Sequence, residues 1–294
     1  MSAVGFTRSR SARVRLAPYL LSAPGLLLFG ILLLTPLVAT ALLSLHSFSM
    51  NTGIQDVYRL DNYRDIFTDS YFHGVFLRTF RIALLVTVVS IALGAPEAYI
   101  LNRMRNPWRG IFLLIGLGPL LISVVSRTLG WVLLFGTTGL VNRGLQAIGL
   151  IAEPLQFMYS ETGVVIALTH VLVPFMVISV WASLQRLDPQ VENAALSLGA
   201  GPITILRRIV LPQVVPGILS GAIIVFALAA SAFATPAIIG GRRLKVVSTL
   251  AYDEFLNTLD WPLGAAIAVL LLVAIVAIVA SRRGSRSATS ATSR

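Results

Sequence analysis

The sequence contains no cysteine and few charged residues. Charged residues make up 12% of the 294 residues, whereas a soluble domain has roughly a quarter. Without cysteine, the chain has neither a disulfide framework nor a thiolate metal site. It also lacks the phosphate-loop pattern G-x-x-x-x-G-K-[ST] and the hydrolase patterns G-x-S-x-G and H-E-x-x-H. These absences argue against an enzyme and against nucleotide binding by a phosphate loop in this chain.

Long apolar runs are the main feature of the sequence, which is 56% hydrophobic. A spanning helix needs roughly 20 apolar residues, and we expect an all-α membrane protein with six such helices. The first run follows several arginines, as in a signal peptide, but it far exceeds an apolar signal region of about 7–15 residues. We therefore expect it to be retained. The predicted spans are 17–45, 79–101, 111–135, 163–184, 217–239 and 263–280.

The distribution of charge predicts the orientation of these spans. If both termini are cytoplasmic, the inner segments carry fourteen basic and two acidic residues, and the outer segments carry eight basic and nine acidic residues. Basic residues are enriched on the cytoplasmic side of membrane proteins. The net charge of +11 is therefore a topology signal, and nucleic acid is not needed to explain it. We expect residues 1–16 to form a basic cytoplasmic segment, 17–280 a six-helix transmembrane domain, and 281–294 a disordered tail.

The cytoplasmic segment 185–216 is predicted to contain two short helices joined by a tight turn. Asp188 can cap the first helix, and Pro189 suits its first position. Gly199 can end that helix in the left-handed conformation. Pro202 can open the second helix, which Leu211-Pro212 would end before the fifth span. The residues alone leave two interpretations open, a rigid helix that docks in a cleft of another protein and an amphipathic loop on the membrane surface.

The same segment resembles the EAA loop of binding-protein-dependent ABC importer permeases. That loop has the pattern E-A-A, three residues, glycine, nine residues and I-x-L-P. Asn193 stands where the family has glutamate, and Glu192 lies one position earlier. Asparagine can hydrogen-bond but cannot form an ion pair. The matching residues are Ala194, Ala195, Gly199, Ile209, Leu211 and Pro212.

The resemblance extends over most of the chain and is greatest to permeases of the spermidine/putrescine subfamily. It implies the type I (MetI-like) importer fold in a bacterial inner membrane. It also implies a cytoplasmic ABC ATPase dimer, a second permease subunit and an external solute-binding protein as partners, with lipid around them. The chain itself would bind no cofactor, because ATP and Mg would be used by the ATPase. The residues that carry this subfamily resemblance are Asn62-Tyr63, Thr138-Gly139, Asn142, 174–176, 255–257, 260–262 and 264–266.

Polar residues near helix-breaking prolines are candidates for a translocation path. Pro174 frees the carbonyl of His170, and Pro236 frees that of Ala232. His170, Ser231 and Thr235 could line a path at these breaks, or they could be packing residues bonded within their own helices. Outer acids and tryptophans would attract ammonium groups or dock the binding protein. This second group comprises Trp131, Asp253, Glu254, Asp260 and Trp261.

Two charged residues, Glu97 and Arg127, fall inside predicted spans, where charge is costly and usually functional. We expect Arg127 to face a cavity or to pair with an outer acid such as Asp260, and we expect a structural role for Glu97. A polyamine is the expected solute, and ferric iron, an aminophosphonate or an opine are the alternatives. A secondary transporter is less favoured, because it would need more ionisable residues along the path and often an internal repeat.

Overall fold

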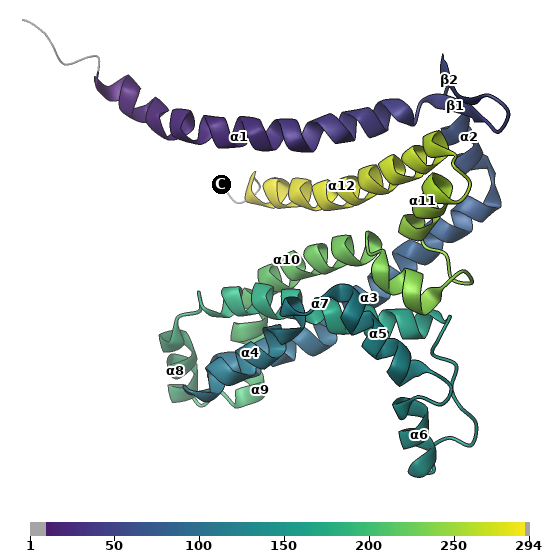
Figure 1. The fold of residues 1–294 in the computed structure, drawn as a ribbon. Coiled ribbons are helices and arrows are strands. Elements are labelled where there is room, and N and C mark those ends of the chain that lie inside the picture. Colours follow the sequence, from purple (N-terminus) through teal and green to yellow (C-terminus); the bar gives the residue numbers. More distant parts are fainter. Residues whose placement is uncertain (1–9, 292–294) are drawn as a thin grey trace, which may run out of the picture.

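The structure is a computed structural model that describes residues 10–291. It is almost entirely helical (Figure 1). The first part of the predicted basic segment, residues 1–9 with Arg8, lies outside the described residues. In chain order the elements are α1 (Arg10–Leu43), β1 (His46–Ser49), β2 (Gly53–Tyr58), α2 (Asp61–Thr68), α3 (Ser70–Arg103), α4 (Trp108–Leu121), α5 (Val124–Phe135), α6 (Leu140–Ala147), α7 (Glu161–Leu184), α8 (Pro189–Ser197), α9 (Pro202–Ile205), the π-turn η1 (Leu206–Val210), α10 (Leu211–Ala230), a second π-turn η2 (Pro236–Gly240), α11 (Val247–Leu256) and α12 (Trp261–Ala291).

Six helical segments are long and apolar enough to cross a membrane, as the sequence predicts. Their bounds differ from the prediction at several ends, because helix ends depend on packing and capping as well as on hydropathy. The fourth segment, Glu161–Leu184, agrees with the predicted 163–184 within two residues. The six segments are Ser22–Leu43, Ser70–Arg103, Val124–Ala147, Glu161–Leu184, Pro202–Ala230 and Trp261–Ser281.

The core of the molecule is formed by α3, α7 and α10, which pack on one another. Two glycines one turn apart let α10 approach α7 closely. A Cβ atom at Gly217 would lie 2.7 Å from Ser183 Cβ, and one at Gly221 would lie 2.7 Å from Met176 Sδ. Helices in membranes associate through such small residues, because lipid provides no hydrophobic driving force between them. The G-x-x-x-G spacing of α10 therefore sets the packing of the core.

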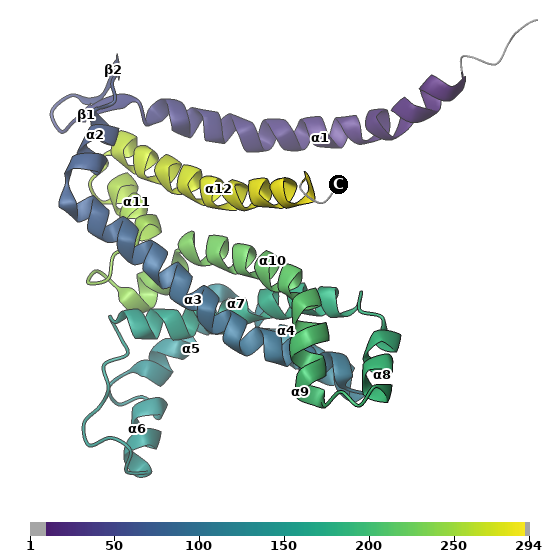
Figure 2. The same ribbon diagram turned by 180° about the vertical axis from the view of Figure 1, so that it is seen from behind.

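Helix α1 lies apart from this core, beside α12 (Figures 1 and 2). The membrane-spanning part of α1 buries none of its residues within the chain. Its leucines and isoleucines are exposed in the described chain, and hydrocarbon or another protein surface can accommodate them. The Arg10 end of α1, the Ala291 end of α12 and the helix α8 lie at one end of the molecule, and the β1–β2 hairpin lies at the other (Figure 1). This arrangement agrees with the predicted orientation, in which both termini are cytoplasmic.

Three predictions of local structure were wrong, and one segment formed an element that the sequence had not predicted. The third predicted span, 111–135, is interrupted at residues 122–123 and forms α4 and α5. The fifth begins earlier and ends at Ala230 instead of 239, since residues 231–233 are not helical. The predicted disordered tail is helical up to Ala291, and only residues 292–294 lie outside the described chain. Residues 46–58 form an antiparallel hairpin in which Phe48 opposes Ile54.

Candidate functional site

The EAA-like segment forms the short helix α8, which lies across the cytoplasmic end of the core helices (Figure 1). Its ends follow the predicted chemistry. Asp188 Oδ1 accepts a hydrogen bond from the Gln190 amide at 2.9 Å, and Pro189 is the first helical residue. Gly199, which follows the C-cap residue Leu198, adopts a φ of +81°, a conformation that glycine adopts without steric cost. Pro202 begins α9, as expected.

Most residues of α8 are exposed, and they carry both polar and apolar side chains. Asn193 and Ala194 are exposed, whereas Ala195 is half-buried and packs against the core. Leu196 and Leu198 are 54% and 88% exposed. Apolar side chains gathered at a cytoplasmic end favour contact with another protein or with lipid. The exposed leucines therefore suit this segment to docking, and the small side chain of Ala194 allows a partner to approach the helix closely.

Two polar contacts connect this segment to the cytoplasmic end of α3. The Arg103 guanidinium forms an ion pair with the Glu192 carboxylate at 2.5 Å. Gln185 Nε2 donates a hydrogen bond to Asn102 Oδ1 at 2.9 Å. Sequence reasoning missed the pairing of Arg103, Asn102 and Gln185, because these residues are more than eighty positions from their partners. The only available signal was that both groups fall at inner helix ends. Glu192 lies one residue before the family's glutamate position, and its carboxylate is already paired with Arg103 of the same chain.

The prediction that Leu211-Pro212 ends the second short helix was wrong. The chain continues without a break through α9 and η1 into α10. Proline has no amide hydrogen to donate within a helix. Here the turn before Pro212 is widened, and the Leu211 amide donates to the carbonyl of Leu206, five residues earlier. Such π-turns are a known way to accommodate an interruption in a helix. Ile209 is half-buried and packs on the core, and Leu211 and Pro212 are exposed.

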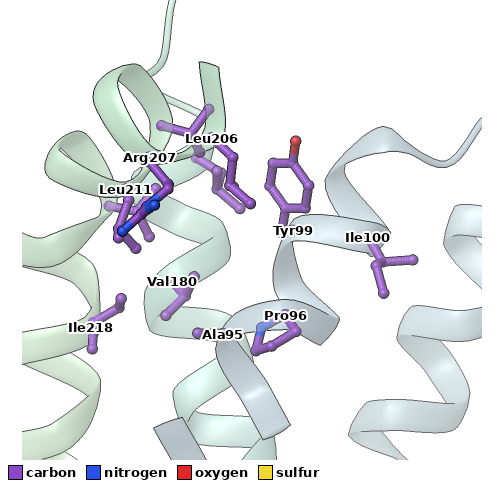
Figure 3. Close-up of a pocket in the computed structure, with 12 residues that line it drawn as sticks. Ala95, Pro96, Tyr99, Ile100, Val180, Leu206, Arg207, Leu211 and Ile218 are labelled. Atoms are coloured by element: carbon purple, nitrogen blue, oxygen red, sulfur yellow. The ribbon is translucent and has the colours of Figure 1, made fainter. Parts of the chain in front are cut away.

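An apolar cavity of about 350 Å³ lies beside this widened turn. Figure 3 shows Leu206, Arg207 and Leu211 on one side and Tyr99 with Pro96 of α3 on the other. The turn is therefore not packed tightly against α3. Because η1 borders an unfilled volume, it makes few contacts with α3 on that side. It can therefore shift relative to α3 at lower cost than a tightly packed segment could.

The residues predicted for a translocation path are divided among different environments. Trp131 and His170 meet, with Trp131 Nε1 donating to His170 Nδ1 at 3.4 Å, and both line a second cavity. Ser231 is exposed and donates to the Ala227 carbonyl of its own helix. Thr235 is only 2% exposed and lies 3.2 Å from the hydroxyl of Thr128. Thr235 is therefore a packing residue in this structure.

Pro236 frees the carbonyl of Ala232, as the sequence predicts. That carbonyl accepts a hydrogen bond from Ser248 Oγ at 2.6 Å. A freed carbonyl in a membrane protein needs such a partner, because no water replaces the lost amide. Pro236 lies in η2, after the membrane-spanning part of α10 has ended, so it is not a kink within a span.

Arg127 does not pair with Asp260 or with any other carboxylate among the described residues. It is the fourth residue of α5, close to the break that interrupts the third span. Its guanidinium donates to the Pro119 carbonyl, near the end of α4. This contact bridges the two helices across the break, which explains why a charged residue is found there. Of the two expectations for Arg127, the pair with Asp260 was wrong, because the guanidinium is bonded to the Pro119 carbonyl.

The acids at the outer end have local partners. Asp253 forms an ion pair with Lys245, and Glu254 Oε2 accepts from Thr258 Oγ1 at 2.6 Å. Asp260 caps α12 by accepting from the Leu263 amide at 3.0 Å. Burial raises the pKa of Asp260, and that amide hydrogen bond lowers it by a smaller amount. Trp261 follows and is exposed. Among the described residues, no group of three or more His, Cys, Asp or Glu residues could hold a metal ion.

The proteins that this chain resembles in sequence are membrane components of transport systems. Residues 155–284 match the family described as "Binding-protein-dependent transport system inner membrane component". The spermidine/putrescine transport system permease protein PotB of Escherichia coli (strain K12) is 31% identical over 220 residues, which cover 75% of this chain and 80% of PotB. The molybdenum transport system permease protein ModB of Mycobacterium tuberculosis (strain ATCC 25618 / H37Rv) is 32% identical over 201 residues, covering 67% of this chain and 73% of ModB.

Solved structures share the fold at lower sequence identity. A bacterial alginate ABC transporter, in complex with its alginate-bound periplasmic protein, aligns with a TM-score of 0.75 at 20% identity over 93% of this chain and 95% of that chain. The inward-facing MetNI methionine ABC transporter aligns with a TM-score of 0.52 at 19% identity over 75% of this chain and 99% of that chain. With six apolar helices and the identity to PotB, the chain belongs to the family of binding-protein-dependent transport system inner membrane components, and it is a multi-pass protein of the bacterial inner membrane.

Proposed function

We propose that this chain forms, with a second permease subunit, the membrane pore of an ATP-driven importer for a polyamine such as spermidine or putrescine. An external binding protein would deliver the solute, and a cytoplasmic ABC ATPase dimer would use ATP and Mg to drive transport. The names of the PotB relatives support this solute class. The ModB relatives make an oxyanion the competing solute. The chain is a translocation subunit and has no phosphate loop of its own.

The observation that carries the proposal is the position of α8. It lies across the cytoplasmic end of the core, exposes Asn193, Ala194 and Leu196, and is capped at both ends by Asp188 and Gly199. A short helix with fixed ends moves as a unit, because its backbone hydrogen bonds need not break. We infer that α8 is the coupling helix that docks on the ATPase.

Motion of α8 has a route into the membrane through α3. The Arg103–Glu192 ion pair and the Asn102–Gln185 hydrogen bond join the coupling segment to the last turn of α3. A partly exposed ion pair contributes about 0–1 kcal/mol. The two contacts therefore orient the segment relative to α3 without holding it rigidly. The continuous helix from α9 into α10 supplies a second route, and the cavity beside η1 leaves room for the shift.

A bulky charge on the docking face tests this proposal. We expect Ala194→Arg to reduce co-purification of the ATPase and polyamine uptake by roughly tenfold or more, which corresponds to about 1.4 kcal/mol or more of lost docking energy. The side chain is exposed, so the permease itself should fold normally. The measurement is affinity purification from native membranes, with mass spectrometry, alongside uptake of labelled spermidine.

Ala152→Arg is the matched control, because Ala152 is also exposed and lies in the loop after α6. That variant should assemble and transport as the parent protein does. Normal ATPase recovery and normal uptake with Ala194→Arg would contradict a coupling role for α8. If the parent complex contained an ATPase but took up molybdate and not spermidine, the importer role would stand, and the proposed solute would be molybdate instead of a polyamine.

A further inference from the structure

A cavity of about 820 Å³ lies within the membrane-spanning region, between α3, α4, α5 and α7. Most of its wall is aliphatic. The polar exceptions are Glu97 of α3, Trp131 of α5, and Thr162, Thr169 and His170 of α7. No lysine or arginine lines it, so an ionised Glu97 makes the cavity electronegative.

Glu97 has no hydrogen-bond or ion-pair partner anywhere in the described residues. It lies six residues, or about 9 Å at 1.5 Å per residue, from the inner end of α3 at Arg103. A carboxylate at this depth is costly unless a cation or water compensates it. The position opposite Glu97 is Gly116 of α4, where a Cβ atom would lie 2.9 Å from Glu97 Oε1. The absence of a side chain at 116 leaves the carboxylate its space.

A second polar group in the same wall also lacks a partner. Thr169 is 4% exposed, and its hydroxyl makes no hydrogen bond among the described residues. Buried hydroxyls are almost always bonded, so an unpartnered one calls for an absent ligand or water. Its neighbour His170 contacts the indole of Trp131 edge to face, with ring centroids 5.4 Å apart. A carboxylate, a free hydroxyl and an aromatic ring thus line one largely apolar volume.

A cation, Arg127, lies close to this volume but does not line it. The Arg127 guanidinium donates to the Pro119 carbonyl, and Pro119 is a wall residue whereas Arg127 is not. The arginine is therefore occupied in joining α4 to α5. The cavity keeps a carboxylate without a protein counter-ion.

We propose that this cavity is a transient binding site for an aliphatic amine with two or more ammonium groups. Glu97 pairs with one ammonium, the Trp131 ring attracts another, and the apolar wall packs on the methylene carbons between them. Thr169 accepts a hydrogen bond from an ammonium N–H. This inference deepens the proposed function and rests on it for the solute class. An oxyanion would be repelled by the same carboxylate.

The test is equilibrium binding of radiolabelled spermidine to the purified permease complex in lipid nanodiscs, without ATP. We expect saturable binding that unlabelled putrescine displaces and molybdate does not. Glu97→Gln removes the charge at nearly constant shape and should weaken binding about tenfold or more. Gly116→Ala should weaken it by displacing the carboxylate, although it leaves every charge in place.

Glu153→Gln is the matched control, because Glu153 is an exposed acid in an outer loop that does not line the cavity. It should bind spermidine as the parent protein does. Thermal unfolding of each variant checks that the chain is folded. A further variant, Trp131→Leu, removes the aromatic ring and leaves every carboxylate unchanged. Trp131→Leu should also weaken spermidine binding.

The inference is overturned if the parent complex shows no saturable spermidine binding, or if folded Glu97→Gln and Gly116→Ala bind it as tightly as the parent. Displacement by molybdate in place of putrescine would also overturn it. The proposed function is judged by different measurements, namely ATPase recovery with the α8 variants and uptake of spermidine against molybdate. An importer that couples through α8 but binds no amine in this cavity would lose only the present inference.

Discussion

At the scale of single residues, buried polar side chains hold loops that hydropathy does not describe. Asn142 is fully buried, and its side chain makes three hydrogen bonds. Nδ2 donates to the carbonyls of Gly136 and Leu155, and Oδ1 accepts from the Leu155 amide. The side chain therefore joins the turn before α6 to the loop after it. A single asparagine does this because its amide both donates and accepts.

Asn142→Ala should lower the stability of the permease by about 1–2 kcal/mol, because a part-buried backbone amide and two carbonyls lose their partner. The measurement is thermal unfolding of the purified protein in detergent. Asn51→Ala is the control, since Asn51 is exposed at the hairpin turn. An unchanged midpoint for Asn142→Ala would show that the loop is held by other contacts.

At the scale of elements, close packing of α10 on α7 decides how the core is built. Gly217 faces Ser183, where a Cβ atom would lie 2.3 Å from the hydroxyl oxygen and 2.8 Å from the Ser179 carbonyl oxygen. Both distances are far below ordinary contact, and one of the two atoms belongs to the backbone. The two helices can be this near only because residue 217 has no side chain.

Gly217→Val should force α10 away from α7 and reduce stability by about 1–3 kcal/mol, as overpacking does in other cores. Thermal unfolding checks this, and uptake should fall with it. Gly30→Val serves as the comparison, because no atom lies within 4 Å of a Cβ atom at Gly30 of α1. Equal stability of the two variants would contradict the packing assigned to Gly217.

At the scale of the whole molecule, charge and hydropathy place α8 and the described ends of α1 and α12 on one side of the membrane. In the structure, α8 and these helix ends lie at one end of the molecule, and the β1–β2 hairpin lies at the other (Figure 2). Because the chain has no cysteine, a single introduced cysteine reports its own side of the membrane without background.

We expect Ser197→Cys in α8 to react with a membrane-impermeant maleimide in inverted vesicles but not in intact spheroplasts. Thr52→Cys in the hairpin should show the reverse pattern. Both positions are exposed in the described chain, so in the permease prepared without its ATPase, which would cover α8, access depends on the side of the membrane alone. Labelling of Ser197→Cys from the outside would invert the topology and remove the basis for docking an ATPase on α8.

Several features of the fold and the site were predictable because they depend on residues close together in the chain. Apolar runs of sufficient length predict helices in a bilayer, and the excess of arginines predicts which ends face the cytoplasm. Asp188, Pro189 and Gly199 act on their own backbone neighbours, so the bounds of α8 follow from local chemistry. The widened turn at Pro212 was missed, because a helix can absorb a proline when its surroundings keep it in place.

What the sequence by itself determined about this protein is therefore that it has six apolar segments able to span a membrane, their orientation, and the bounds of α8. Only the tertiary structure decided which distant residues meet. It paired Arg103 with Glu192, buried Thr235 against Thr128, and placed Glu97 in a cavity with Thr169 and Trp131. These contacts depend on how separate helices rotate and pack, and the pattern of any one helix leaves that rotation open.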